Sequence, residues 1–273
     1  MEKHDNIPEE TRDEKLESFA KRNESKKKLL KYLSIPAVII AIIVFAVVCF
    51  VFFFKVRTIE VKGASKYNAQ TLVIASEIEI GENLYSFDED TVKENLTLNY
   101  PYISDVNVVR RWPDKIILEI KEESASYVTE MYGETLILSE SLRVLENPQV
   151  PAESYDLCYI IIPDIERALV GNKPVFTGNA DYIMPVLEYI KASKINGNIT
   201  TIDLRSKFDI KFLMGTMYKV DCGDTGDMKL KLDMTEKILA SGHIKEGQKA
   251  ELNVSNPDEC TAIIGENAVI AID

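Results

Sequence analysis

The chain has 273 residues, a formal net charge of −12 and 46% hydrophobic residues. Such an acidic chain lacks the basic surface that neutralises phosphates, which argues against a general nucleic-acid binder. Glycine and proline are too few for a low-complexity chain, and the length suffices for one large or two ordinary folded domains.

An uncharged apolar run near the N-terminus, residues 35–54, reads IPAVIIAIIVFAVVCFVFFF. A helix of about 20 residues, rising 1.5 Å per residue, spans the ~30 Å hydrocarbon core of a bilayer. A cleaved signal peptide would need a shorter apolar run and a small-residue cleavage site, whereas 34 residues precede this run. We therefore predict a transmembrane helix over 35–54 that is retained as a single-pass anchor.

The two flanks of the apolar run differ in charge. Six bases and one acid lie at positions 21–31, directly before it, whereas the far flank has four bases, Lys55, Arg57, Lys62 and Lys66. Because positive charge is retained on the cytoplasmic side, this asymmetry predicts a cytoplasmic N-terminus and extracytoplasmic C-terminal domains. Residues 1–34 are predicted to be a cytoplasmic tail that is largely disordered, since its first 20 residues are rich in acids and poor in apolar positions.

The segment that follows, residues 55–125, has the pattern of a small β-α-α-β-β domain. Its predicted elements are a strand at 56–61, helices at 68–78 and 88–100, and strands at 105–111 and 116–120. Asp88 is a suitable N-cap for the second helix, and Pro101 ends that helix. Ile116, Leu118 and Ile120 are predicted to form the inward face of the last strand, with Glu119 and Lys121 on its outward face.

Three groups of residues in this segment carry a resemblance to a known family. They are Val61 and Gly63; Gly81, Asn83, Leu84 and Asp88; and Pro101, Ile103, Val106, Val108, Arg110 to Pro113, Ile116, Leu118, Ile120 and Glu122. Over Val56 to Glu123 they resemble the POTRA domain of the FtsQ/DivIB family of bacterial cell-division proteins. The family usually continues with Glu-Arg-x-Pro-x-Ala, whereas this chain has Glu122-Glu123-Ser124-Ala125, which blurs the boundary of the domain.

Residues 126–265 have the signals of a second, mostly β domain. Its predicted elements are a hairpin at 127–131 and 135–138, strands at 156–162, 199–204, 208–214, 217–222, 250–254 and 261–264, and helices within 179–197 and 227–242. This order resembles the β-domain of the FtsQ/DivIB family, and residues 266–273 are predicted to be a short C-terminal tail. The predicted fold class is therefore α+β: one transmembrane helix, a POTRA domain, and a mostly β second domain with flanking helices.

The cysteines give no disulfide framework. Cys49 lies in the apolar run and Cys158, Cys222 and Cys260 follow it, an odd number that cannot all pair within one chain. We interpret these three as buried small hydrophobic residues, while a Cys222 to Cys260 bridge stays open.

The sequence that follows the apolar run contains no HExxH, GxSxG, SxxK or P-loop motif. Its one histidine is His243, and the other histidine of the chain, His4, lies in the predicted cytoplasmic tail. The run from Asp221 to Asp227 places three carboxylates at every third position, which suits calcium, but the same residues are typical of a structural turn before a helix. The sequence therefore predicts a protein that is not an enzyme and has no cofactor and no metal.

Two surfaces are candidates for binding a partner. The resemblance implies that the end of the β-domain pairs with an FtsB- or DivIC-like bitopic protein, with an FtsL-like protein in the same complex. The matching positions are Glu259, Cys260, Thr261, Ala262, Ile263, Ile264 and Gly265. An ordinary closing strand covered by the last residues is the alternative, and the aromatic residues of the family's strand are missing here. Arg110, Arg111 and Trp112 form a secondary candidate surface, equally well explained as a strand end and turn beside the anchor.

The resemblance and the missing catalytic motifs together favour a non-enzymatic scaffold of the cell-division machinery. Such a protein would be anchored in the cell membrane at the division septum through residues 35–54, bind FtsB/DivIC-like and FtsL-like partners, and help regulate septal peptidoglycan synthesis. The alternative is a membrane-anchored extracytoplasmic enzyme or binding protein that uses the POTRA domain as a spacer.

Overall fold

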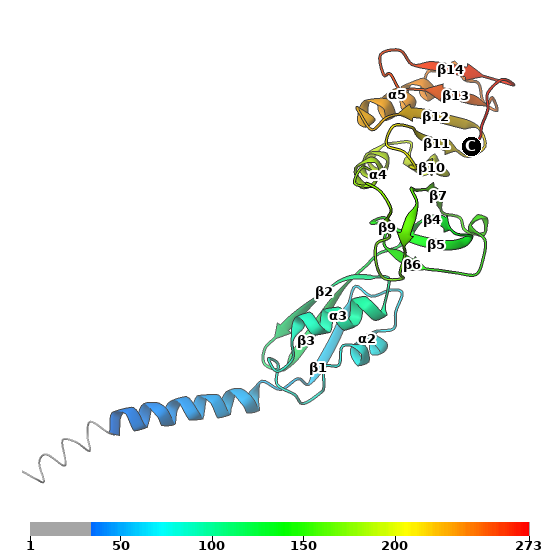
Figure 1. Ribbon diagram of the computed structural model, residues 1–273. Helices are drawn as coiled ribbons and strands as arrows, with labels where there is room; N and C mark the ends of the chain where they lie inside the picture. Colours follow the sequence, from blue (N-terminus) through cyan, green and yellow to red (C-terminus); the bar gives the residue numbers. More distant parts are fainter. Residues whose placement is uncertain (1–33, 273) are drawn as a thin grey trace, which may run out of the picture. The chain divides into compact units, whose positions relative to one another are not determined.

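The computed structural model describes residues 34–272 (Figure 1). Within this range one helix, Ser34–Phe53, is long and apolar enough to cross a membrane, which fits the predicted anchor. Its bounds differ by one residue from the predicted span of 35–54. The predicted tail, residues 1–34, lies outside the described residues apart from Ser34, and so do the bases at positions 21–31.

The chain divides into two compact units. The first combines the segment that ends at Ile59 with residues 79–87 and 110–116. The second combines Glu60–Ile78, Asp88–Val109 and the rest of the chain from Ile117. The predicted domain limits 55–125, 126–265 and 266–273 stay predictions.

The elements after the apolar helix follow the predicted β-α-α-β-β order. They are β1 (Thr58–Lys62), α2 (Ala69–Ala75), α3 (Glu89–Asn99), β2 (Ile103–Arg111) and β3 (Lys115–Glu122), and the strands pair in the order β1-β3-β2. Both helices begin at side-chain caps. The Asn68 side chain accepts a hydrogen bond from the Gln70 N–H at 2.8 Å, and the Asp88 carboxylate accepts one from the Thr91 N–H at 3.1 Å.

The predicted inward face of β3 is buried. Ile116, Leu118 and Ile120 are at most 6% exposed, whereas Glu119 is exposed. Ile117 is buried as well, which simple alternation did not predict. β3 is the central strand of the three, with β1 and β2 paired to its two edges.

Gly63 is required where the chain leaves β1. Its φ is +82°, in the left-handed region that favours glycine. A Cβ atom at this position would lie 2.2 Å from the backbone oxygen of Ile120 in β3. The close approach of the two backbones therefore excludes any side chain at position 63.

The rest of the chain builds a mixed sheet of nine strands, ordered β14-β13-β12-β11-β10-β7-β4-β5-β6 (Figure 1). The strands are β4 (Ala125–Met131), β5 (Glu134–Ser139), β6 (Val144–Glu146), β7 (Cys158–Ile161), β10 (Thr201–Asp203), β11 (Ile210–Met214), β12 (Tyr218–Gly223), β13 (Ala250–Asn253) and β14 (Thr261–Ile264). The β4·β7, β7·β10 and β12·β13 pairs are parallel, and the other pairs are antiparallel.

Two helices connect parallel strands and bury their apolar faces against the sheet. Helix α4 (Ile183–Ala192) lies between β7 and β10 in the chain, and α5 (Met228–Ala240) lies between β12 and β13. Val186 and Leu187 of α4 and Leu232 of α5 share one core cluster with the inward residues of the strands. Pro185 is tolerated because it lies in the first turn of α4.

Some short elements differ from the prediction. The strand predicted at 156–162 shortens to β7, and β6, β8 (Ile165–Arg167) and β9 (Val175–Phe176) were not predicted. Two short 3₁₀ turns, Ala152–Ser154 and Asn196–Asn198, were also not predicted. Strands of two or three residues are too short to give a recognisable period of alternation. The α+β class, with a mostly β C-terminal region, is confirmed.

All four cysteines are free thiols, so the open question of a Cys222 to Cys260 bridge is answered against it. Cys222 is fully buried as predicted, but Cys158 and Cys260 are only half-buried. Burial raises the pKa of the Cys158 and Cys222 thiols to about 12, so both stay protonated and unreactive near neutral pH.

Candidate functional site

The candidate site at residues 259–265 forms the last strand at one end of the nine-stranded sheet. Thr261, Ala262, Ile263 and Ile264 make up β14, and all four are exposed. Glu259 and Cys260 lead into the strand from a turn, where the Glu259 N–H donates to the Asn256 oxygen at 3.1 Å. Gly265 ends the strand with a φ of +92°. Among the described residues, no strand pairs with the outer side of β14.

The register of β14 shows which backbone groups face outward. It pairs with β13 as Ala250↔Ile264 and Leu252↔Ala262, and the Gly265 N–H donates to the Lys249 oxygen at 2.9 Å. Inward and outward backbone groups alternate along an antiparallel strand. The N–H and C=O groups of Ala262 and Ile264 therefore point away from β13, toward the open edge.

An apolar groove of about 550 Å³ lies beside this edge, between α5 and β14. Met234 and Ile238 of α5 line one wall, and Ala262 and Ile264 of β14 line the other. Sequence reasoning identified the strand but missed the groove. The sequence feature that indicates this groove is a pair of apolar residues, Met234 and Ile238. They lie four positions apart on α5, next to the buried face of that helix.

The opposite end of the sheet is closed. Strand β6 forms that end, and two of its three residues are buried. The Val144 N–H donates to the Asn172 oxygen at 2.9 Å, and the Gly171 N–H donates to the Val144 oxygen at 2.8 Å. The loop at 171–172 thus pairs with the outer backbone groups of Val144 in β6, so the two ends of the sheet differ in what they offer a partner.

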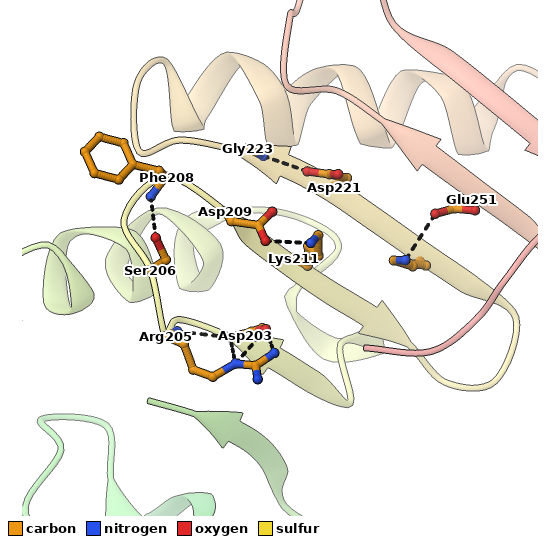
Figure 2. A network of polar contacts seen from close by, with 10 residues as sticks. Asp203, Arg205, Ser206, Phe208, Asp209, Lys211, Asp221, Gly223 and Glu251 are labelled. Carbon is orange, nitrogen blue, oxygen red and sulfur yellow. Dashed lines mark hydrogen bonds and ion pairs between the residues drawn. The ribbon is translucent and has the colours of Figure 1, made fainter. Parts of the chain in front are cut away.

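The sheet face opposite α4 and α5 is polar (Figure 2). Asp203, Lys211 and Asp221 are cross-strand neighbours on β10, β11 and β12, so opposite charges alternate across the sheet. Arg205 holds the buried Asp203 carboxylate through an ion pair of 2.6 Å. On this face the charged side chains of β10, β11 and β12 are therefore paired with one another.

Two further ion pairs complete that polar face. Lys219 of β12 contacts Glu251 of β13 at 3.1 Å, and Lys211 donates to the Asp209 carboxylate at 2.7 Å (Figure 2). The hydrogen bond from Lys211 to Asp209 raises the pKa of the Lys211 ammonium. The series of charged cross-strand pairs ends at β13. Its neighbour on β14 is Ile263, which faces Glu251 and is apolar and 50% exposed.

The loop from Asp221 to Asp227 is organised by an internal lysine. Lys231 of α5 is 2% exposed, and its ammonium donates to the Asp224 carboxylate at 2.8 Å and to the Asp224 backbone oxygen at 3.0 Å. The hydrogen bond from Lys231 lowers the pKa of Asp224. Asp227 precedes α5 with a φ of +50°, and its side chain makes no capping hydrogen bond. Within residues 34–272, no group of acids, histidines and cysteines could hold a metal.

His243 follows the end of α5 and lines the groove. Its Nδ1 atom lies 2.8 Å from the Ser241 hydroxyl, and the side chain is exposed. No carboxylate or second nucleophile is hydrogen-bonded to this ring in the described part of the chain. The arrangement is therefore that of a polar residue at a helix end.

Of the secondary candidate residues, Arg110 and Arg111 end strand β2, and Trp112 lies in the turn that leads to β3. The Arg110 Nε donates to the Leu84 oxygen at 2.6 Å, and its guanidinium lies over the Tyr85 ring at 5.2 Å. The Trp112 Nε1 donates to the Tyr85 hydroxyl at 2.7 Å, while Arg111 and Trp112 are exposed. Sequence reasoning missed Tyr85, because it lies in a loop far from these residues in the chain.

Comparisons with known proteins agree with this architecture. Residues 54–123 match the family described as the POTRA domain, FtsQ-type. This part of the chain is an FtsQ-type POTRA domain. The match coincides with the segment Val56 to Glu123 that carried the resemblance in the sequence, so that prediction is confirmed.

The similarity extends beyond the POTRA domain. The chain is 23% identical over 245 residues to the cell division protein DivIB of Clostridium botulinum (strain Hall), covering 88% of this chain and 93% of that protein. It is 24% identical over 208 residues to DivIB of Clostridium tetani, covering 74% and 77%. It is 25% identical over 239 residues to the cell division protein FtsQ of Corynebacterium glutamicum, covering 86% and 98%. The homologues of this chain are thus DivIB and FtsQ proteins over most of its length.

Proposed function

We propose that this chain is a non-enzymatic, membrane-anchored scaffold of the cell-division machinery. Its homologues are named as cell division proteins, and the described residues offer an open sheet edge in place of a catalytic constellation. In this proposal the scaffold binds FtsB/DivIC-like and FtsL-like proteins and thereby helps regulate septal peptidoglycan synthesis.

The observation that carries the proposal is the open edge of β14 beside an apolar groove. A partner segment in extended conformation would pair with the outward groups of Ala262 and Ile264. Apolar side chains that flank this segment would enter the groove along Met234 and Ile238. Main-chain hydrogen bonds would supply affinity without large contact residues on β14, which fits the lack of aromatic residues there.

Proline substitution at position 262 tests this pairing. Ala262→Pro removes an outward N–H, and the chain before a proline is restricted to the extended conformation that β14 already has. We expect the full chain in detergent to lose co-elution with the FtsB/DivIC-like protein of the same organism, while its thermal unfolding stays cooperative. The matched control Ala262→Val keeps the N–H and should keep binding. Full binding by Ala262→Pro would place the partner site elsewhere.

The proposed location is the cell membrane at the septum, with the N-terminus in the cytoplasm and the C-terminal domains outside. The apolar Ser34–Phe53 helix and the bases at positions 21–31 support this topology. A periplasmic-type reporter fused after Asp273 should be active outside the cytoplasm, and the same reporter fused before Met1 should be inactive. The reverse pattern of activities would contradict the proposed topology.

A further inference from the structure

Aromatic side chains from two POTRA loops gather on the end of the apolar helix. Phe54 directly follows that helix, and its ring lies 5.2 Å from the Trp112 ring in an edge-to-face arrangement. Phe50 lies inside the helix, one turn earlier, and its ring stacks on Tyr85 at 5.4 Å. We call these four residues the aromatic collar; all belong to one compact unit.

Backbone hydrogen bonds tie the collar to the helix end. The Leu84 N–H donates to the Phe54 oxygen at 2.8 Å, and the Val56 N–H donates to the Glu82 oxygen at 2.8 Å. The Asn83 side-chain amide donates to the Phe50 oxygen at 3.2 Å, and this oxygen also accepts from the Phe54 N–H at 3.3 Å. The loop at 79–87 is therefore fixed beside the point where the chain leaves the helix.

The length of the helix sets the depth of the collar. Twenty residues at 1.5 Å each match a hydrocarbon core of about 30 Å, so Phe54 falls at the boundary between hydrocarbon and headgroups. Trp and Tyr are enriched at that boundary because their rings are apolar and their N–H or O–H groups are polar. Trp112 is 71% exposed and Tyr85 is 43% exposed, as rings that enter a bilayer interface must be.

The compact unit that contains the aromatic collar has an excess of positive charge, which suits an anionic phospholipid surface. Its described residues include five bases, Lys55, Arg57, Arg110, Arg111 and Lys115, and three acids, Glu79, Glu82 and Asp114. The excess of bases is notable in a chain whose net charge is −12. Basic residues next to a membrane helix are attracted to anionic headgroups.

We propose that the aromatic collar is a lipid-contacting surface that docks the POTRA domain on the bilayer. Trp112 and Tyr85 enter the headgroup region next to the helix end, and Arg111 contacts anionic phospholipid headgroups. The membrane then holds the domain at two places, the helix and the two loops. This inference goes beyond the proposed scaffold function, because it concerns lipid and not the division partner.

The single tryptophan of the chain makes the proposal directly measurable. The full chain is reconstituted in vesicles of phosphatidylcholine and phosphatidylglycerol, and flotation establishes that the helix is inserted. We expect lipids brominated near the headgroup to quench Trp112 strongly, lipids brominated deep in the acyl chain to quench it less, and aqueous acrylamide to quench it weakly.

Phe208 provides the matched control, because it is 71% exposed like Trp112 but lies outside the collar. In the double variant Trp112→Phe with Phe208→Trp, the tryptophan should be several-fold more sensitive to acrylamide and insensitive to brominated lipid. Equal quenching of the two positions, with the helix inserted, would overturn the proposal.

A charge reversal tests the contribution of anionic lipid. Arg111→Glu should reduce the gain in Trp112 shielding that phosphatidylglycerol produces over pure phosphatidylcholine. Lys121→Glu makes the same change of charge at an exposed residue of β3 outside the collar and should leave that gain unchanged. If both variants behave like the native protein, the anionic-headgroup part of the proposal is wrong.

Discussion

At the level of single residues, the backbone around position 63 admits only glycine. Gly63→Ala adds a Cβ atom 2.2 Å from the Ile120 oxygen and also forces alanine to a φ of +82°. Gly133 has a similar φ of +80°, but nothing lies within 4 Å of its position for a Cβ atom.

We expect Gly133→Ala to lower the free energy of unfolding by about 1 kcal/mol, the cost of the backbone conformation alone. Gly63→Ala should cost clearly more, because the backbones of β1 and β3 must also separate. Chemical denaturation of both variants measures the difference. Equal losses would show that the close contact at Gly63 relaxes freely.

A second residue-scale prediction concerns pH. Lys231 holds the Asp224 carboxylate, so the pKa of Asp224 is lower in the folded state than its ordinary value of 3.8. A carboxylate with a lowered pKa contributes stability that is complete above the unfolded pKa and is lost as the pH falls through the folded pKa.

Asp224→Asn should therefore be less stable than the native protein at neutral pH, since it leaves the buried Lys231 ammonium without its carboxylate. The gap between the two denaturation midpoints should close below about pH 4. Asp233 is an exposed residue of α5, the helix that carries Lys231. The denaturation midpoint of Asp233→Asn should differ little from that of the native protein at any pH. A gap that stays constant from neutral to acidic pH would contradict the assigned role of this pair.

At the level of secondary structure, substitutions on α5 test whether the groove takes part in partner binding. Met234 lines the groove, whereas Leu230, one turn earlier and 44% exposed, does not. Met234→Asp should weaken binding of the FtsB/DivIC-like protein by roughly tenfold or more, which is about 1.4 kcal/mol. Leu230→Asp should leave the affinity unchanged. Titration of both variants by calorimetry measures this, and equal affinities would exclude the groove from the interface.

The elements that the sequence predicted well are those with local signals. Asp88 is the cap that the sequence predicts for α3, and Ile116, Leu118 and Ile120 mark the buried face of β3. The partners of each strand were not predicted, because the parallel pairing of β12 with β13 joins segments that are distant in the chain. The groove and the aromatic collar were missed for the same reason, since each forms only when distant elements meet.

At the scale of the whole molecule, the two proposed contacts use different residues. Partner binding is assigned to β14, and lipid contact is assigned to the collar that includes Trp112. The two activities should therefore separate by mutation. Ala262→Pro should leave lipid quenching of Trp112 unchanged, and Arg111→Glu should leave partner co-elution unchanged. Loss of both activities in either variant would indicate that one surface depends on the other.

Backbone amide exchange reports at single residues whether a partner strand adds to the open edge of β14. The amides of Thr261 and Ile263 point toward β13, whereas those of Ala262 and Ile264 point outward. Addition of the FtsB/DivIC-like partner should slow hydrogen exchange at Ala262 and Ile264 and change Thr261 and Ile263 much less. Unchanged exchange at Ala262 and Ile264 in a fully formed complex would show that no partner strand pairs with β14.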